Sequence, residues 1–439
     1  MKKNFKQSLT AALLGSAIAA ASGSASAYNF YSKDGTELNV DIEAAFGVFT
    51  SGENYGTTGG KTEGSSDWRE GYIKYGLSGS QTLGASSAAL YGGVNMVSSA
   101  TWGDGDAAGF TTGEESKSTL EDAYLGWRSG SLISMLGEDG LDISFGRQNF
   151  AIGDGFLING DALNFGKAFD GSLNRGGSYW LAARKAFDRT AIVRIGGSDG
   201  ARADMFWLKS DNVAQNKTEL AGLNTEYVMA AGTFGASYIK GLDAEARPSR
   251  DGQETMSLRY QGNAGVENLF LSGEYVTQDQ GDDSASADAW YVEGGWTFAG
   301  LPWSPSASYR YSTFEEGFDP LFFGFNRGYG TWFQGEVAAN YAGPFNSDAD
   351  VHHIAIKASP SEMVSVGALF FDFSDTAGGS GALDGQEIDI YAEWVVTPNL
   401  ILSPLVGFYS PDNSAANGGT QLGNDDTNVY AQIIAIVPF

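Results

Sequence analysis

Seven arginines are the residues of this sequence whose type and surroundings best suit the binding of a ligand. Most of them lie in segments where polar and apolar side chains alternate, and the others lie in loops beside such segments. A guanidinium group is planar, permanently charged and able to bind a carboxylate through two parallel hydrogen bonds. The candidate substrate-binding residues are Arg128, Arg147, Arg184, Arg194, Arg259, Arg310 and Arg327.

Catalytic chemistry has little support in the composition. The 439 residues include no cysteine, which excludes thiol nucleophiles and cysteine-ligated metals. The two histidines, His352 and His353, are adjacent, so on a strand they point to opposite faces and cannot form one metal site or catalytic pair. We therefore expect no enzyme activity, no cofactor and no bound metal. The net charge of −27 argues against a nucleic-acid partner, because phosphate binding requires a basic surface.

The first 27 residues have the pattern of a secretory signal peptide. Lys2, Lys3 and Lys6 give a positive start, an apolar stretch follows, and Ala25-Ser26-Ala27 has the form of a cleavage site. The apolar stretch is too short for a transmembrane anchor. We expect residues 1–27 to be removed and residues 28–439 to form one domain.

The rest of the chain alternates with a period of two. Clear examples are Glu37–Phe49, Gln253–Gln261, Trp332–Tyr341, Gln386–Val396 and Thr427–Phe439. This alternation is typical of strands with one apolar and one polar face. Each of the roughly twenty candidates has about 9–13 residues, the length of a strand that crosses a bilayer at a tilt. A soluble sandwich has shorter strands.

These features predict an all-β fold, a transmembrane antiparallel β-barrel in the bacterial outer membrane. The polar faces carry charges and aromatic residues gather near strand ends, as expected for a polar lumen and lipid-level aromatic girdles. The chain length suggests about 18 strands, with 16–20 possible. The terminal Phe439 resembles the end of outer-membrane barrels that the barrel insertion machinery recognises. The expected surroundings are outer-membrane lipid and lipopolysaccharide.

Counting strands back from Phe439 assigns a side to each connection. Pro411–Asp426, Asp375–Gly385 and Tyr341–Asp350 are expected on the extracellular side. The long aromatic segment Phe314–Gly330 then falls on the periplasmic side, where turns are normally short. Either one strand is miscounted, or this segment folds into the lumen as a partial plug.

Several motifs, taken in order, resemble the alginate-export family of outer-membrane porins. They lie between Asp142 and Pro411, and the first 140 residues show no comparable match. The resemblance implies an 18-stranded barrel, an arginine-lined constriction that passes an anionic polysaccharide, and a long periplasmic segment that gates the pore. The motifs are Asp142–Gln148, Gly153–Ile158, Ala168–Gly171, Phe318–Leu321 with Arg327–Gly330, and Gly385–Ile390 with Thr397–Leu400.

Strand parity places several arginines inside the barrel. Arg194 shares a face with Thr190, and a charge that faces lipid would be costly, so the inward orientation is favoured. Simple alternation places Arg147 on the same face of its strand as apolar neighbours. A bulge at Gly146 would turn the Arg147 side chain inward. Many acids have inward parity as well, so the lumen wall carries both signs of charge. These acids are Asp41, Glu43, Glu70, Glu274, Glu336, Glu387, Asp389 and Glu393.

The resulting hypothesis is an outer-membrane channel for the diffusion of anionic carbohydrate, polysaccharide or a small acidic solute. Selection would depend on the width of the lumen and the charges on its wall. Two alternatives stay open. One is a general or sugar-uptake porin without anion preference, and the other is a plugged barrel that acts as a surface binding protein.

Overall fold

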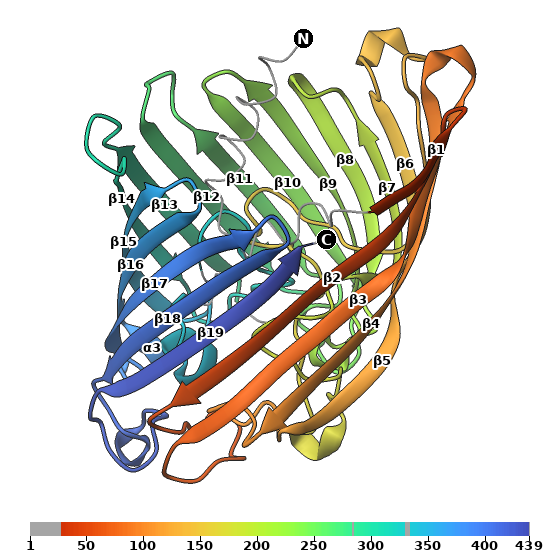
Figure 1. Cartoon of the computed structure of the whole chain (residues 1–439). Coiled ribbons are helices and arrows are strands. Elements are labelled where there is room, and N and C mark those ends of the chain that lie inside the picture. Colours follow the sequence, from red (N-terminus) through yellow and green to blue (C-terminus); the bar gives the residue numbers. More distant parts are fainter. Residues whose placement is uncertain (1–27, 283–284, 330–333, 439) are drawn as a thin grey trace.

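The computed structural model describes residues 28–438 except 283–284 and 330–333. The predicted leader and Phe439 lie outside the described residues. Every strand pairs antiparallel with the next, and the last strand, β19, pairs with β2, so β2 to β19 close into a barrel of eighteen strands (Figure 1). The predicted all-β barrel of about 18 strands is confirmed.

The strands vary in length from one side of the wall to the other, and β2 to β5 are the longest. The strands are β1 (Tyr28–Lys33), β2 (Thr36–Ser51), β3 (Ser66–Leu83), β4 (Ala88–Gly103), β5 (Glu114–Arg128), β6 (Leu141–Gln148), β7 (Phe187–Ile195), β8 (Gly200–Lys209), β9 (Glu219–Met229), β10 (Gly232–Asp243), β11 (Glu254–Gly262), β12 (Leu269–Asp279), β13 (Ala287–Thr297), β14 (Ser306–Phe314), β15 (Ala349–Ser361), β16 (Val364–Ser374), β17 (Gly385–Thr397), β18 (Leu400–Pro411) and β19 (Asn428–Pro438). The short helical turns are η1 (Gly84–Ser86), η2 (Ser134–Leu136), η3 (Phe169–Gly171), η4 (Val213–Gln215), η5 (Ala338–Ala342), α3 (Thr376–Gly379) and η6 (Ala415–Asn417).

The two faces of the wall have the polarity expected of a barrel in lipid. On β11 the outward Met256 and Leu258 are 52% and 66% exposed, whereas the inward Thr255 and Ser257 are 1% and 3% exposed. A soluble protein would bury the apolar row instead. The apolar row therefore faces outward and the polar row faces the lumen.

No helix within the described residues is long and apolar enough to cross a membrane.

The N-terminal strand β1 lies outside the ring of eighteen. It pairs with the first part of β2, where Tyr28 is opposite Val40. β19 pairs with the remainder of β2 and reaches Glu43 through Pro438. β1 and β19 therefore follow one another along the same edge of β2.

Long connections gather at one end of the barrel and short turns mostly at the other (Figure 1). Residues 34–35, 362–363 and 398–399 are two-residue turns, whereas 149–186 and 315–348 are long connections. Since bacterial barrels carry long loops outside the cell and short turns in the periplasm, the end with the long connections is extracellular.

One predicted strand and one predicted side are wrong. Residues 315–348 form a single connection between β14 and β15, so Phe314–Gly330 does not belong to a periplasmic segment. The described part of Trp332–Tyr341 is an irregular turn followed by η5, and its side chains are buried inside the barrel. Its alternating sequence therefore reflects burial within the lumen. The other four strands named from the sequence correspond to β2, β11, β17 and β19.

Candidate functional site

Two long connections fold into the lumen and join there. Residues 149–186 follow β6, and residues 315–348 follow β14. Ile158 and Phe322 form a parallel bridge, and the amide of Asn159 donates to the carbonyl of Phe322 at 2.7 Å. Phe156 and Leu157 pack with Phe322 in one buried apolar cluster. These two connections, called the inner segments below, narrow the passage that the eighteen strands enclose.

The second inner segment is also tied to the wall. The Glu387 carboxylate on β17 accepts hydrogen bonds from the amides of Glu336, Val337 and Ala338 at 2.5–3.2 Å. Tyr341 packs against Trp68 on β3, with ring centroids 5.6 Å apart. These contacts hold the second inner segment against the β2–β3 and β17 side of the barrel.

Three arginines converge on Asp211, which lies in the connection after β8. Arg147 donates to the Asp211 carboxylate at 2.9 Å, Arg175 donates to it at 3.4 Å, and Arg184 approaches it to 3.7 Å. All three side chains are at least 93% buried. Burial alone would raise the pKa of Asp211, but the three guanidinium groups outweigh this effect and lower the pKa. We call these three residues the arginine triad.

Some nitrogen atoms of the triad have no hydrogen-bond partner. Nε and Nη2 of Arg147 and Nε of Arg175 are buried and have no hydrogen-bond partner within the described structure. Further acids bind part of the triad, because Arg147 contacts Asp188 at 2.9 Å and Arg184 contacts Glu121 at 3.2 Å. The three guanidinium groups therefore face four carboxylates, those of Glu121, Asp161, Asp188 and Asp211, while three of their buried nitrogen atoms stay unpaired.

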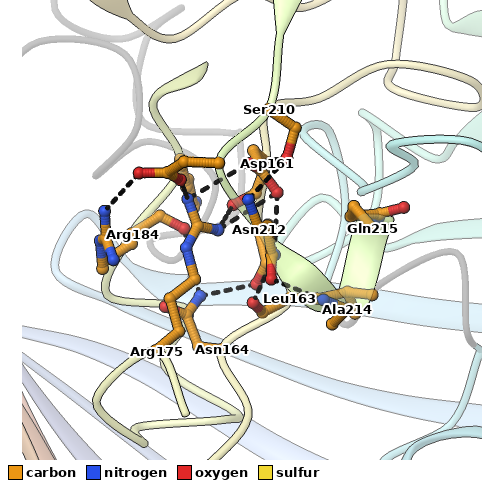
Figure 2. A network of polar contacts seen from close by, with 12 residues as sticks. Asp161, Leu163, Asn164, Arg175, Arg184, Ser210, Asn212, Ala214 and Gln215 are labelled. Atoms are coloured by element: carbon orange, nitrogen blue, oxygen red, sulfur yellow. Dashed lines mark hydrogen bonds and ion pairs between the residues drawn. The ribbon is translucent and has the colours of Figure 1, made fainter. Parts of the chain in front are cut away.

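Asp161 fixes the geometry of this region (Figure 2). Its carboxylate is fully buried and accepts from Ser210 Oγ at 2.7 Å, from Asn212 Nδ2 at 2.9 Å and from Arg175 Nη2 at 3.2 Å. Ser210 and Asn212 flank Asp211 in sequence. Asp161 therefore positions the Asp211 loop and one member of the triad at the same time.

Lys185 is a second source of positive charge beside the triad. Its backbone amide donates to Glu121 at 2.7 Å, but its ammonium group makes no hydrogen bond or ion pair with any described residue. A bulge on β5 between the partners of Asn95 and Met96 lets both Glu121 and Asp122 face inward. Burial lowers the pKa of Lys185.

Arg310 and Arg327 form a separate group with two acids. Arg327 contacts Asp154 at 2.9 Å and Glu293 at 2.7 Å, and Arg310 contacts Glu293 at 3.7 Å. Both guanidinium groups also lie over the ring of Phe325, at 5.0 Å and 5.3 Å from its centroid. With two bases and two acids, this group is balanced and ties the second inner segment to the wall.

The charge of Arg259 is likewise neutralised by an acidic neighbour. Its guanidinium donates to Glu226 at 2.5 Å, to Asn224 at 2.6 Å and to Ser237 at 2.9 Å. Arg202 binds the other oxygen of the same Glu226 carboxylate. Both arginines line a cavity of about 510 Å³ at the periplasmic side of the inner segments.

Arg194 lies between this cavity and a neighbouring one of about 410 Å³, and it lines both. It is 40% exposed, and its nearest acids are distant, with Asp142 at 3.8 Å and Asp204 at 3.9 Å. Arg128 is similarly open, over the ring of Tyr91 at 5.2 Å. The linings of the two cavities contain more acids than bases. The acids are Asp41, Glu43, Asp122, Asp139, Asp142, Asp154, Asp204 and Glu226, and the bases are Lys74, Arg194, Arg202 and Arg259.

The structure therefore divides the seven predicted arginines into three environments. Arg147 and Arg184 meet in the triad, and Arg310 and Arg327 share Glu293. Arg194 and Arg259 line the periplasmic cavities, and Arg128 lies over the ring of Tyr91. The expected bulge at Gly146 is present, since the register shifts there and Gly146 has a φ of 121°. Their role in substrate binding stays a prediction.

Sequence reasoning missed Arg175 and Lys185. Both lie in the segment Lys167–Lys209, in which eight bases accompany four acids, and this excess was the available signal. Neither residue lies on a strand, so the alternation of side chains along a strand cannot predict the direction in which it points. Their convergence on the lumen depends on the fold of that segment.

The two histidines lie on opposite faces of β15, as predicted. His352 bonds the Tyr309 hydroxyl at 2.7 Å on the outer face, whereas His353 stacks on Phe371 inside, with ring centroids 4.4 Å apart. Within the described ranges, no three histidine or carboxylate side chains are arranged to hold a metal ion.

Comparison with known proteins gives matches of fold. No protein-family model matches the sequence, and neither does any curated protein. Among solved structures, a BenF-like porin from Pseudomonas fluorescens Pf-5 is similar, with a TM-score of 0.59 and 8% identity over 92% of this chain and 99% of that one. Acinetobacter baumannii OccAB4 has a TM-score of 0.55 and 11% identity over 91% and 98%. Pseudomonas aeruginosa OccK11 has a TM-score of 0.54 and 11% identity over 91% and 96%.

These likenesses establish the fold of an 18-stranded outer-membrane porin. They agree with the closed antiparallel barrel that the strand pairings show. At 8–11% identity they carry no information about the solute.

Proposed function

We propose that this chain is a diffusion channel of the outer membrane that admits small solutes bearing a carboxylate, acidic sugars foremost among them. The observation that carries the proposal is the arginine triad, in which Arg147, Arg175 and Arg184 converge on the single carboxylate of Asp211. Channel walls select by width and by charge, and the Asp211 carboxylate beside these guanidinium groups is 38% exposed.

The triad suits a passing anion because it can exchange one carboxylate for another. A solute carboxylate that enters beside Asp211 meets guanidinium donors already oriented by Asp161 and Glu121. Lys185 and Arg194 then offer less compensated charges on the way to the periplasmic cavities.

The resemblance to the alginate-export family extends this proposal to an anionic polysaccharide. No family model supports that step. The two inner segments favour a short solute, because a polymer would have to thread between them in an extended form. We therefore rank a single acidic sugar or small acidic solute above a polyuronate.

Two alternatives keep specific support. The acid-rich lining of the periplasmic cavities favours a general porin without anion preference. The joined inner segments favour a plugged barrel that acts as a surface binding protein. Export by the predicted leader and insertion through Phe439 belong to all three hypotheses.

Single-channel recording of the purified barrel in a planar bilayer tests the proposal. Under a salt gradient we expect a reversal potential that favours anions, and glucuronate should cause brief current blocks while glucose at the same concentration should not. A cation-selective channel that glucuronate does not block would support the general porin. Absence of conductance would support the plugged binding protein.

A further inference from the structure

One basic residue faces lipid without an acidic partner. Arg69 on β3 is exposed on the outer face, between the inward, buried Trp68 and Glu70. Its guanidinium has no hydrogen bond or ion pair with any described residue. Other outward bases near the extracellular end are paired, for example Lys209 with Glu219 at 2.7 Å and Lys240 with Glu254 at 2.8 Å.

Arg69 lies at the level of the membrane interface on the extracellular side. It is close to Ser66, where β3 begins at that end, and Trp102 is its partner on β4. Trp102 is 45% exposed and packs on Phe46 with ring centroids 6.3 Å apart. Tryptophan at such a position marks the boundary between lipid headgroups and acyl chains.

Two apolar hollows lie beside Arg69 on the outer face of the wall. One of about 410 Å³ is lined by Arg69 itself, with Val48 and Ala431. The other, of about 440 Å³, lies toward the membrane centre and is lined by Ala435 and Gly71, among others. The hollows form where small outward residues such as Ala431, Ala435 and Gly71 lie beside larger outward side chains on neighbouring strands.

A lone guanidinium above two apolar hollows matches one class of molecule. The outer leaflet of a Gram-negative outer membrane presents lipid A, which combines phosphate groups with saturated acyl chains. A phosphate supplies the anion that Arg69 lacks, and acyl chains fill concave apolar surface. A second barrel would present a convex wall, which leaves such hollows empty.

We propose that Arg69 and the two hollows form a binding site for the phosphate and acyl chains of one lipid A unit. The site lies on the outer face of β19, β2, β3 and β4, separate from the lumen. Asp67 is exposed and also lines the first hollow, but it makes no ion pair with Arg69 and leaves the guanidinium charge available. Occupancy would anchor the barrel in the lipopolysaccharide leaflet.

Native mass spectrometry of the detergent-purified barrel with added hexa-acylated lipid A tests this assignment. We expect one lipid A bound at low concentration, and at least tenfold weaker binding of the dephosphorylated lipid, as for loss of a charge-assisted contact. The variant Arg69→Gln should weaken binding of the phosphorylated lipid by a similar factor. Ala435→Leu should fill the second hollow and weaken binding of both lipids.

The control is Lys240→Gln, which removes an outward base that already has an acidic partner. It should bind lipid A like the wild type. Equal binding by Arg69→Gln and wild type would overturn the proposal, as would equal binding of the dephosphorylated lipid or equal loss in Lys240→Gln. A stable dimer that Arg69→Gln dissociates would assign the face to a second copy instead. Because Arg69 lies outside the lumen, unchanged conductance shows that the variant barrel is folded.

Discussion

Arg250 and Asp319 form a two-point ion pair between the β10–β11 connection and the second inner segment. Nε of Arg250 donates to Oδ2 of Asp319 at 2.7 Å, and Nη2 donates to Oδ1 at 2.6 Å. The two side chains are 2% and 1% exposed. The Gln278 side-chain amide also donates to the backbone carbonyl of Asp319 at 2.7 Å and accepts from the backbone amide of Asp319 at 2.8 Å. This pair fixes the inner segment at the point where it leaves the wall.

Removing Arg250 should loosen the second inner segment. Breaking a buried ion pair by removing one partner costs about 3–5 kcal/mol, because the remaining charge is buried without compensation. We expect Arg250→Ala to show a larger and noisier single-channel current than the wild type. Arg247→Ala is the control, since Arg247 reaches Asp319 only at 3.4 Å and is 38% exposed, and its effect should be small. Identical currents in Arg250→Ala and wild type would contradict this role.

The same pair predicts how the channel responds to acid. Burial raises the pKa of Asp319, but Arg250 and Arg247 outweigh it and lower the pKa below its ordinary value of 3.8. A carboxyl with a lowered pKa stabilises the folded form above its unfolded pKa, and that stability is lost as the pH falls through the folded pKa. We expect currents at pH 5 and pH 7 to be alike.

Asp319→Asn mimics the protonated carboxyl and supplies the comparison for the acid prediction. It should give the loosened, noisy current already at pH 7. A wild-type channel that becomes noisy between pH 7 and pH 5 would show that another group controls the segment.

Arg175→Ser tests the arginine triad at the member that sequence reasoning did not select. Loss of one guanidinium leaves Asp211 less compensated, so the reversal potential should shift toward cations and glucuronate block should weaken by about tenfold. Lys240→Ser is the control, because Lys240 lies on the outer face of β10 and its acidic partner, Glu254, does not contact the triad. Equal shifts in the two variants would indicate a general effect of charge and would remove the triad from the selectivity mechanism.

Deletion of residues 315–327 tests whether the second inner segment narrows the pore. β14 and β15 pair along their length without help from this segment, so the barrel should still close. We expect a severalfold rise in conductance together with weaker selectivity, since a wider lumen brings solutes less close to the wall. The intact barrel can be checked by its resistance to unfolding in detergent at room temperature. An unchanged conductance would exclude the segment as a constriction.

The wall of the barrel was predictable because each strand obeys a local rule. A residue of β11 or β17 faces lipid or lumen according to its parity, so Arg259 needed no knowledge of distant residues. Arg147 needed one more step, the bulge at Gly146, which a glycine in the middle of a strand suggests. These inferences depend on neighbours within a few positions.

The contents of the lumen were less predictable because they depend on distant contacts. The alternation in Trp332–Tyr341 has the form of a strand, yet the described part of that segment ends in η5 within the barrel. Counting it as a strand moved Phe314–Gly330 to the wrong side. The position of Arg175 follows from Asp161, Ser210 and Asn212, which no local pattern brings together.

The barrel is closed by the two ends of the chain. β19 meets β2 through pairs such as Tyr430 with Ser51, and β1 continues the same edge from Tyr28. Every other pairing in the wall joins neighbours in sequence, so it can form while the chain is incomplete. The pairing of β19 with β2 can form only when the final residues are present. It joins the most distant parts of the chain, so its closure costs the most chain entropy of any pairing in the wall. Assembly is therefore expected to end at this seam, with an open, curved sheet as the last state before the ring is complete.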